Sequence, residues 1–411
     1  APAGMTTYAT AHAAVGRRAR RRARPPLPLL AVALAVGAMA VVPVAYLALR
    51  ALEGGADAMG PLLRQRTLEL VLSTIVLGVS VTVGSVGLGV PLAWLTTSTD
   101  LPARRAWSVL AIAPLAVPSY LLAFAFVGAF APRGWLVGLL TELGLEVTPS
   151  VYGFGGTTVV LSLATMPYVV LATRAALARL DPATDEAARS LGDGAWAAAR
   201  TAVVPVIIPA VGAGALLACL YAIADFGAVS ILRYDTLATA IYSQYRFSFD
   251  RSGAAALALL LLALALALVW AEARVRRRVA LATPHGRRRV ATPVRLGRWR
   301  WPAMLFIVAV AFLALGIPVV TIVSWLAAGS GAIRSPELGL DALRDSLVIA
   351  GAAAALAIAV AVPLAHLGVR FPGRWSGSTE RLLYAVYALP GISLALAFVF
   401  FTLNAVPVLY Q

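Results

Sequence analysis

The sequence predicts an all-α polytopic membrane protein. Hydrophobic residues make up 61% of its 411 positions and charged residues 13%, well below the roughly 25% charge of a soluble domain. The apolar residues gather in runs long enough to cross a bilayer, which takes about 20 residues. We expect spans near 28–50, 68–95, 107–131, 156–178, 203–232, 253–273, 302–327, 342–368 and 380–404.

Residues 1–24 form a basic tail ahead of the first span, with arginines concentrated at 17–24. The apolar run that follows continues for about 20 residues and has no small-residue cleavage pattern. We therefore expect a membrane anchor at this position and not a cleaved signal peptide.

Arginine is distributed unevenly between alternate loops. The arginine-rich loops are 17–24, Arg104 and Arg105, the loop around Glu186, the segment 274–300, and Arg370, Arg374 and Arg381. The intervening loops, 51–67, 132–155, 233–252 and 328–341, carry fewer arginines. Because positive loops stay in the cytoplasm, the N-terminus and the Glu186 loop are predicted to be cytoplasmic.

Several other functional classes are disfavoured by composition. The net charge of +16 follows from short arginine runs beside apolar segments, a pattern of membrane topology and not of nucleic-acid binding. Cys219 is the single cysteine, and His12, His285 and His366 are scattered, so no metal site is expected. The chain lacks lysine and hence a phosphate-binding loop with its lysine, so we expect no cofactor in this chain and no enzymatic activity.

The chain contains an internal repeat. Pro91-Leu92-Ala93 recurs as Pro363-Leu364-Ala365, and Pro118 recurs as Pro390 with similar apolar residues after it; both offsets are 272 residues. Both copies begin with a span that enters from the predicted cytoplasmic side, so the repeats are parallel. We expect a first repeat of six spans at 25–273, a basic cytoplasmic linker at 274–300, and a truncated second repeat of three spans at 301–411.

The repeat also predicts what a complete second copy would contain. By the same offset the counterpart of Glu186 would lie beyond Gln411. We expect a fragment of a twelve-span protein, with a natural nine-span protein as the alternative.

The loop at 181–205 carries a distinctive motif. Asp181 and Pro182 predict the start of a short helix, and Gly192 predicts its end. The motif consists of Glu186, Ala187 and Ala188 within this helix, Gly192 at its end, and Pro205 thirteen residues after the glycine. An ordinary amphipathic connector would also fit, but residue types, spacing and predicted location agree with a docking element.

This motif resembles the signature loop of permease subunits in binding-protein-dependent ABC importers. Ala202 and Val204 depart mildly from the family's usual isoleucine and leucine. The resemblance implies the ABC importer transmembrane fold in a bacterial inner membrane. It also implies that Glu186, Ala187, Ala188, Gly192 and Pro205 couple the spans to two copies of an ATP-binding subunit, which binds the ATP. An extracytoplasmic solute-binding protein and the lipid bilayer are the other expected partners, and no nucleic acid is expected.

A second resemblance concerns the segment from Leu216 to Tyr242, which contains Asp225-Phe226-Gly227. It is similar to fused, two-repeat permeases of the ferric-iron importer type, so ferric iron is the expected cargo. Permeases for thiamine, phosphonate or polyamine share parts of this layout and stay open. An ion-coupled secondary transporter is the alternative from another class, although it would normally carry several buried ionisable residues. A scaffold role is disfavoured by the Glu186 loop.

Asp225 and Tyr221 are the candidate residues for the substrate path. An acidic residue within an apolar span is a functional candidate because an unpaired charge in hydrocarbon is costly, and Tyr221 lies four residues earlier on the same predicted helix face. A carboxylate bonded at a helix end and an interfacial aromatic anchor are the alternative roles. Pro114, Pro118 and Pro167 are expected to kink their spans.

Overall fold

The chain is mostly helical in the part that the computed structural model describes, which comprises residues 25–55, 60–145, 150–178, 203–248, 250–279, 293–327 and 336–371 and positions 391, 394 and 398. An isolated bridge between Thr99 and Val294 joins two extended segments within these ranges. Helices satisfy their own backbone hydrogen bonds, as a bilayer demands. The predicted all-α membrane class is confirmed.

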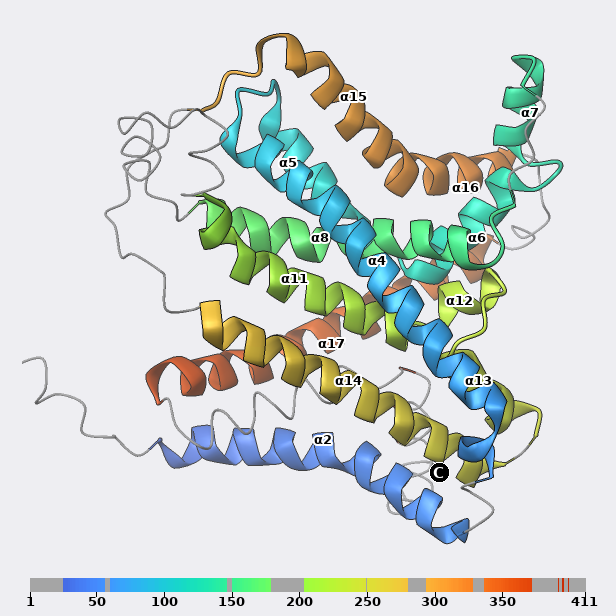
Figure 1. The fold of residues 1–411 in the computed structure, drawn as a ribbon, viewed down its shortest axis with the longest axis vertical. Coiled ribbons are helices and arrows are strands. Elements are labelled where there is room, and N and C mark those ends of the chain that lie inside the picture. The colour runs from blue at the N-terminus through green and yellow to red at the C-terminus, as the bar shows by residue number, and fades with distance from the viewer. Residues whose placement is uncertain are drawn as a thin grey trace, which may run out of the picture. The chain divides into compact units, whose positions relative to one another are not determined.

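The elements follow each other along the chain as shown in Figure 1. The α-helices of the first part are α2 (Leu27–Glu53), α4 (Gln65–Ser98), α5 (Arg104–Ile112), α6 (Ser119–Phe130), α7 (Trp135–Glu142) and α8 (Phe154–Leu177). They are followed by α11 (Val204–Ala224), α12 (Gly227–Ile231), α13 (Leu237–Arg246), α14 (Arg251–Val279), α15 (Arg300–Ala311), α16 (Ile317–Ala327) and α17 (Pro336–Arg370). Short turns of helix occupy Pro61–Leu63, Ala113–Ala116, Gly297–Trp299 and Phe312–Gly316, the last of them a π-helix that joins α15 to α16.

Eight helical segments among the described residues are long and apolar enough to cross a membrane. They are Leu27–Glu53, Gln65–Ser98, Ser119–Glu142, Phe154–Leu177, Val204–Ala224, Arg251–Arg274, Gly297–Ala327 and Gly339–Gly368. Seven of these fall on predicted spans, and Ser119–Glu142 overlaps the second half of the predicted span 107–131. The predicted ninth span, 380–404, lies outside the described ranges except for positions 391, 394 and 398.

The third span differs from the prediction of one helix over 107–131. The helix α5 ends at Ile112, a 3-10 turn that contains Pro114 follows, and α6 starts after Pro118. Val117 has φ −95° and ψ 114°, the extended conformation that a following proline imposes. The two prolines therefore break the helix here, whereas Pro167 lies within the continuous helix α8.

The chain divides into two compact units. One comprises Ala1–Val42 and Ile333–Val386 and contains the first part of α2 and the whole of α17. The other comprises Pro43–Ala332 and Tyr387–Gln411 and is called the main unit below. The two parallel repeats, and the expectation that the chain is a fragment of a twelve-span protein, stay predictions. The repeated prolines Pro91 and Pro363 lie inside helices of nearly equal length, 34 residues in α4 and 35 in α17.

The main unit is built on close packing of α8 against both α4 and α11. Gly84 of α4 faces Ser162 of α8, and Gly214 of α11 faces the backbone at Val169, so that a side chain on either glycine would collide with its neighbour. Small residues allow helix backbones to approach in this way in a membrane. These contacts hold the three helices side by side and fix the relative position of their ends.

One end of the main unit gathers arginine-bearing segments and is called the arginine end, defined as 98–105 with 293–300. The Asp100 N–H donates to the Val294 carbonyl (3.1 Å), and the Val294 N–H donates to the Ser98 carbonyl (2.9 Å). The Asp100 carboxylate accepts from the Leu296 N–H (2.9 Å). Loops that are separated by almost 200 residues and were predicted to share one side of the membrane therefore lie together.

The other end of the main unit, called the opposite end, is defined as 61–74, 150–153 and 232–253. The Gly153 N–H donates to the Leu232 carbonyl (2.7 Å), and the Leu237 N–H donates to the Thr74 hydroxyl (3.0 Å). Arg66 forms an ion pair with Asp235. These segments lie in or directly beside the loops 51–67, 132–155 and 233–252, which were all predicted to lie on the other side of the membrane.

Candidate functional site

The predicted coupling residues Glu186, Ala187, Ala188 and Gly192 lie outside the described residues, as does all of 179–202. Pro205 lies within the described part. It occupies the first turn of α11, which starts at Val204, a position where proline is tolerated because its missing N–H has no helical partner.

Both flanks of the segment 179–202 are placed by the structure. The helix α8 ends at Leu177, and the Arg174 guanidinium in its last turn donates to the Ser108 carbonyl of α5 (3.4 Å). Since α5 starts at the arginine end and α11 packs along α8, the end of α8 and the start of α11, which flank 179–202, lie toward the arginine end. Glu186 itself lies outside the described residues, so its location on the same side as Arg104 and Arg105 stays a prediction.

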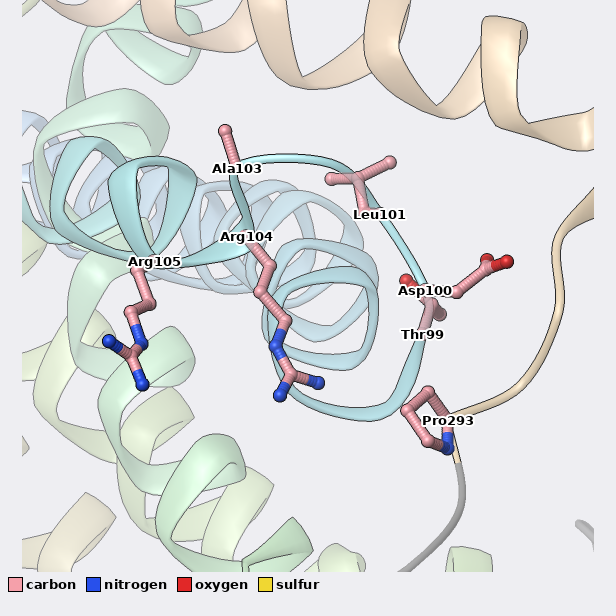
Figure 2. A pocket seen from close by; sticks show the side chains of 7 residues that line it. All are labelled: Thr99, Asp100, Leu101, Ala103, Arg104, Arg105 and Pro293. Carbon is pink, nitrogen blue, oxygen red and sulfur yellow. The ribbon is translucent and has the colours of Figure 1, made fainter.

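An open pocket lies at the arginine end and was not predicted from the sequence. Its lining residues are Thr99, Asp100, Leu101, Ala103, Arg104, Arg105 and Pro293. Figure 2 shows the side chains of Arg104 and Arg105 extending in the same direction from the start of α5, whereas Asp100 extends to another side. The ion pairs found among the described residues involve Arg50 and Arg66, so the structure pairs neither Arg104 nor Arg105 with a described acid.

Asp225 lies at the break between α11 and α12 and is 9% exposed. One carboxylate oxygen accepts from the Ser119 hydroxyl (2.5 Å), and the other accepts from the Ala228 N–H (2.8 Å). The second bond satisfies a backbone donor in the first turn of α12, as a helix-capping carboxylate does. Asp225 thereby ties the end of α11, the start of α12 and the start of α6 together.

Tyr221 lies one turn before Asp225 in α11 and is partly buried against the core. Its ring centroid is 6.2 Å from that of Tyr168 in α8. The structure thus places Tyr221 at the contact between α11 and α8 and Asp225 at the contact between α11 and α6.

Ser119 is the residue of this cluster that sequence reasoning missed. It is buried, and 106 positions separate it from the carboxylate that it contacts. Its one local signal is that a small polar residue directly follows Pro118 at the start of an apolar run. That signal indicates a helix start, but it does not identify Asp225 as the partner.

The described residues contain no group of three or more histidine, cysteine, aspartate or glutamate side chains placed to hold a metal ion. Of the three histidines, His366 falls within the described ranges, in α17. The side chains gathered around Asp225 are suited to hydrogen bonding and packing.

Comparison with known proteins identifies the class and then the family. Residues 85–281 match the family described as the binding-protein-dependent transport system inner membrane component. The chain is 30% identical over 395 residues to a ferric-iron transport system permease protein of Haemophilus influenzae, an alignment that covers 94% of this chain and 74% of that relative. It is also 29% identical over 141 residues to the sulfate transport system permease protein of Escherichia coli, covering 34% of this chain and 50% of that relative.

Among solved structures, a bacterial alginate ABC transporter in complex with an alginate-bound periplasmic protein is similar at 16% identity and a TM-score of 0.43, covering 54% of this chain and 82% of that one. The class defined by the helices and the relatives is a multi-span transport permease of the membrane. The chain belongs to the family of inner-membrane components of binding-protein-dependent transport systems.

Proposed function

We propose that this chain forms the translocation path of an ATP-driven importer that receives its cargo from an extracytoplasmic solute-binding protein. The observation that carries the proposal is the alignment with a ferric-iron permease over 94% of the chain, since it includes both predicted repeats and the linker between them. Access to the path would alternate between the two sides of the membrane as the bundle changes conformation.

Ferric iron is the proposed cargo, again because of the relative that covers nearly the whole chain. Sulfate is the second candidate, favoured by the similarity of part of the chain to a sulfate permease. The two ions differ in charge sign, so they would not share one binding protein. Delivery by a separate protein fits a permease that has no metal-ligating cluster in its described residues.

ATP hydrolysis is proposed to take place on a separate subunit, two copies of which dock against the cytoplasmic face. Glu186, Ala187, Ala188, Gly192 and Pro205 would form the docking element. The location of both flanks of 179–202 at the arginine end supports this role, because that end carries the loops predicted to be cytoplasmic. The N-terminus would lie on the same side.

Asp225 and Tyr221 are proposed to lie in the wall of the path. Support comes from the position of Asp225, a buried acid at the break of a helix that is otherwise apolar. Broken helices at such positions are common where transporters bind their cargo. The carboxylate would act there by holding the wall together, since both of its oxygens are bonded to the protein.

Uptake by reconstituted vesicles tests the proposal. The complete transporter, with its ATP-binding subunit and the solute-binding protein encoded beside it, is placed in proteoliposomes loaded with ATP. We expect accumulation of radioactive ferric iron that requires both partners and stops without ATP. Accumulation of sulfate alone would reject iron as the cargo, and uptake driven by an ion gradient without ATP would favour a secondary transporter.

A further inference from the structure

Arg233 is held in an unfavourable backbone conformation at the opposite end. Its φ is +55°, and Ala103 is the other non-glycine residue with positive φ in the described part of the chain. A bulky residue in this region costs free energy and persists where the surrounding structure fixes it. Residues in this conformation occur at functional sites and also directly after helices, as here after α12.

Hydrogen bonds on both sides of Arg233 fix its backbone. The Leu232 N–H donates to the Ala228 carbonyl (2.9 Å), and the Tyr234 N–H donates to the Val229 carbonyl (3.0 Å). The Leu232 carbonyl accepts from the Gly153 N–H. Residue 233 therefore protrudes from a turn that is anchored to α12 and to the loop before α8.

The side chain of Arg233 is also positioned. Its guanidinium lies over the ring of Tyr152, 4.7 Å from the centroid, a contact in which a cation is attracted to the ring face. Arg233 is exposed, and the Tyr152 ring is 43% exposed. The acid two residues further on, Asp235, is paired with Arg66, and the ion pairs of the described residues leave Arg233 out.

The result is a preorganised arginine beside an exposed tyrosine, with Phe154, two residues after Tyr152, also 41% exposed. Arginine and tyrosine are enriched among the residues that dominate protein–protein binding, and a guanidinium pairs with a carboxylate through two parallel hydrogen bonds. Attraction to a lipid surface typically uses clusters of four to eight basic residues, whereas the residue two positions after Arg233 is the acid Asp235.

We propose that Arg233 and Tyr152 form an anchor on the outer face that binds an acidic side chain of the docked solute-binding protein. The proposal rests on the proposed function and on the predicted orientation of the opposite end. In this proposal Arg233 and Tyr152 recognise the solute-binding protein, and other residues bind the cargo. Because the arginine is already held in place, little side-chain freedom is lost on docking.

The test compares Arg233→Gly and Arg233→Lys in the complete transporter in lipid nanodiscs. Glycine removes the guanidinium and also relieves the backbone strain, so failure to fold is not expected to confound the result. With the solute-binding protein encoded beside the permease as probe, we expect Kd to rise about 10- to 30-fold for Arg233→Gly, mainly through faster dissociation. Lysine should recover part of the loss, and ATPase activity without the binding protein should not change.

Arg133→Gln provides the matched control, since Arg133 is exposed in another loop predicted to be on the outer face. We expect it to change Kd less than threefold. Equal affinity of wild type and Arg233→Gly overturns the inference, as do equal losses in Arg233→Gly and Arg133→Gln. If an effect of Arg233→Gly vanishes in nanodiscs without anionic lipid, a headgroup is the partner and the inference is wrong. Failure of the wild type to bind any such protein rejects the proposed function instead.

Discussion

The two ends of the main unit are held together in different ways. At the arginine end, backbone hydrogen bonds join the loop after α4 to the segment before α15, and Arg104 and Arg105 have no described acid as a partner. At the opposite end, side chains supply several of the contacts, such as the ion pair of Arg66 with Asp235 and the Thr74 hydroxyl that accepts from the Leu237 N–H. The arginine end therefore leaves Arg104 and Arg105 without an acidic partner among the described residues, whereas the opposite end pairs Arg66 with Asp235.

This difference suggests that the two ends of the main unit bind different kinds of partner. Exposed, unpaired arginines can meet an acidic partner or the headgroup region without first breaking internal bonds. An end whose polar groups are bonded internally has a defined shape, which favours recognition by a rigid partner. The predictions below challenge this contrast through substitutions at the two ends.

Asp225→Ala is expected to have the largest effect on stability. It removes two hydrogen bonds to a buried carboxylate and leaves the Ala228 N–H without its acceptor, at a cost of about 2–3 kcal/mol in the free energy of unfolding. Asp225→Asn keeps an acceptor for that N–H and should cost less. Unfolding in detergent micelles measures both variants, and equal costs for alanine and asparagine would show that the capping bond is unimportant.

Asp100→Ala is expected to have a smaller effect at the arginine end. The variant loses the bond from the Leu296 N–H to the carboxylate, worth about 0.5–1.5 kcal/mol, while the backbone bonds to Val294 remain. The same unfolding assay applies. A loss as large as that of Asp225→Ala would mean that side chains hold the arginine end as well, which would remove the contrast between the ends.

The ion pair between Arg66 and Asp235 should contribute less still. Both side chains are more than half exposed, at 60% and 65%, and exposed pairs typically couple by about 0.2–1 kcal/mol. A double-mutant cycle of Arg66→Ala and Asp235→Ala measures the coupling, which should shrink as salt is added. A coupling that salt does not change would indicate a buried pair.

Arg104→Gln combined with Arg105→Gln should have the smallest effect on stability. Since neither guanidinium has a described acidic partner, we expect the free energy of unfolding to change by less than about 0.5 kcal/mol, as for most surface substitutions. A larger loss would reveal a structural role for these arginines and contradict the view that their charges are available to a partner.

Much of the fold could be predicted from the sequence because bilayer crossing needs long apolar runs, and eight such helices appear where the apolar runs are. For the break after Ile112, the sequence predicted a continuous helix kinked at Pro114 and Pro118. Whether a proline kinks or ends a helix depends on which neighbours cover the freed carbonyls: Pro167 stays within α8, whereas Pro118 precedes α6. Which neighbours pack against these carbonyls depends on the tertiary structure and cannot be predicted from the local sequence.

The candidate site was predictable only in part. Pro205 starts α11 as its motif indicated, and Asp225 was singled out because acids are rare in apolar segments. Its partner Ser119, the pocket beside Arg104 and the strained Arg233 were missed. Each depends on contacts between distant segments or on a backbone angle, and a single sequence records neither.

The central claim is that the segment between α8 and α11 engages a separate ATP-hydrolysing subunit. Co-purification of that subunit with the permease tests it most directly, comparing wild type with Glu186→Arg and with the control Glu142→Arg, an exposed acid in a loop predicted to be on the other side. The account predicts that wild type and the control retain the ATPase and that Glu186→Arg retains less than a tenth as much. Undiminished retention by Glu186→Arg, or its loss in Glu142→Arg alone, would contradict the account.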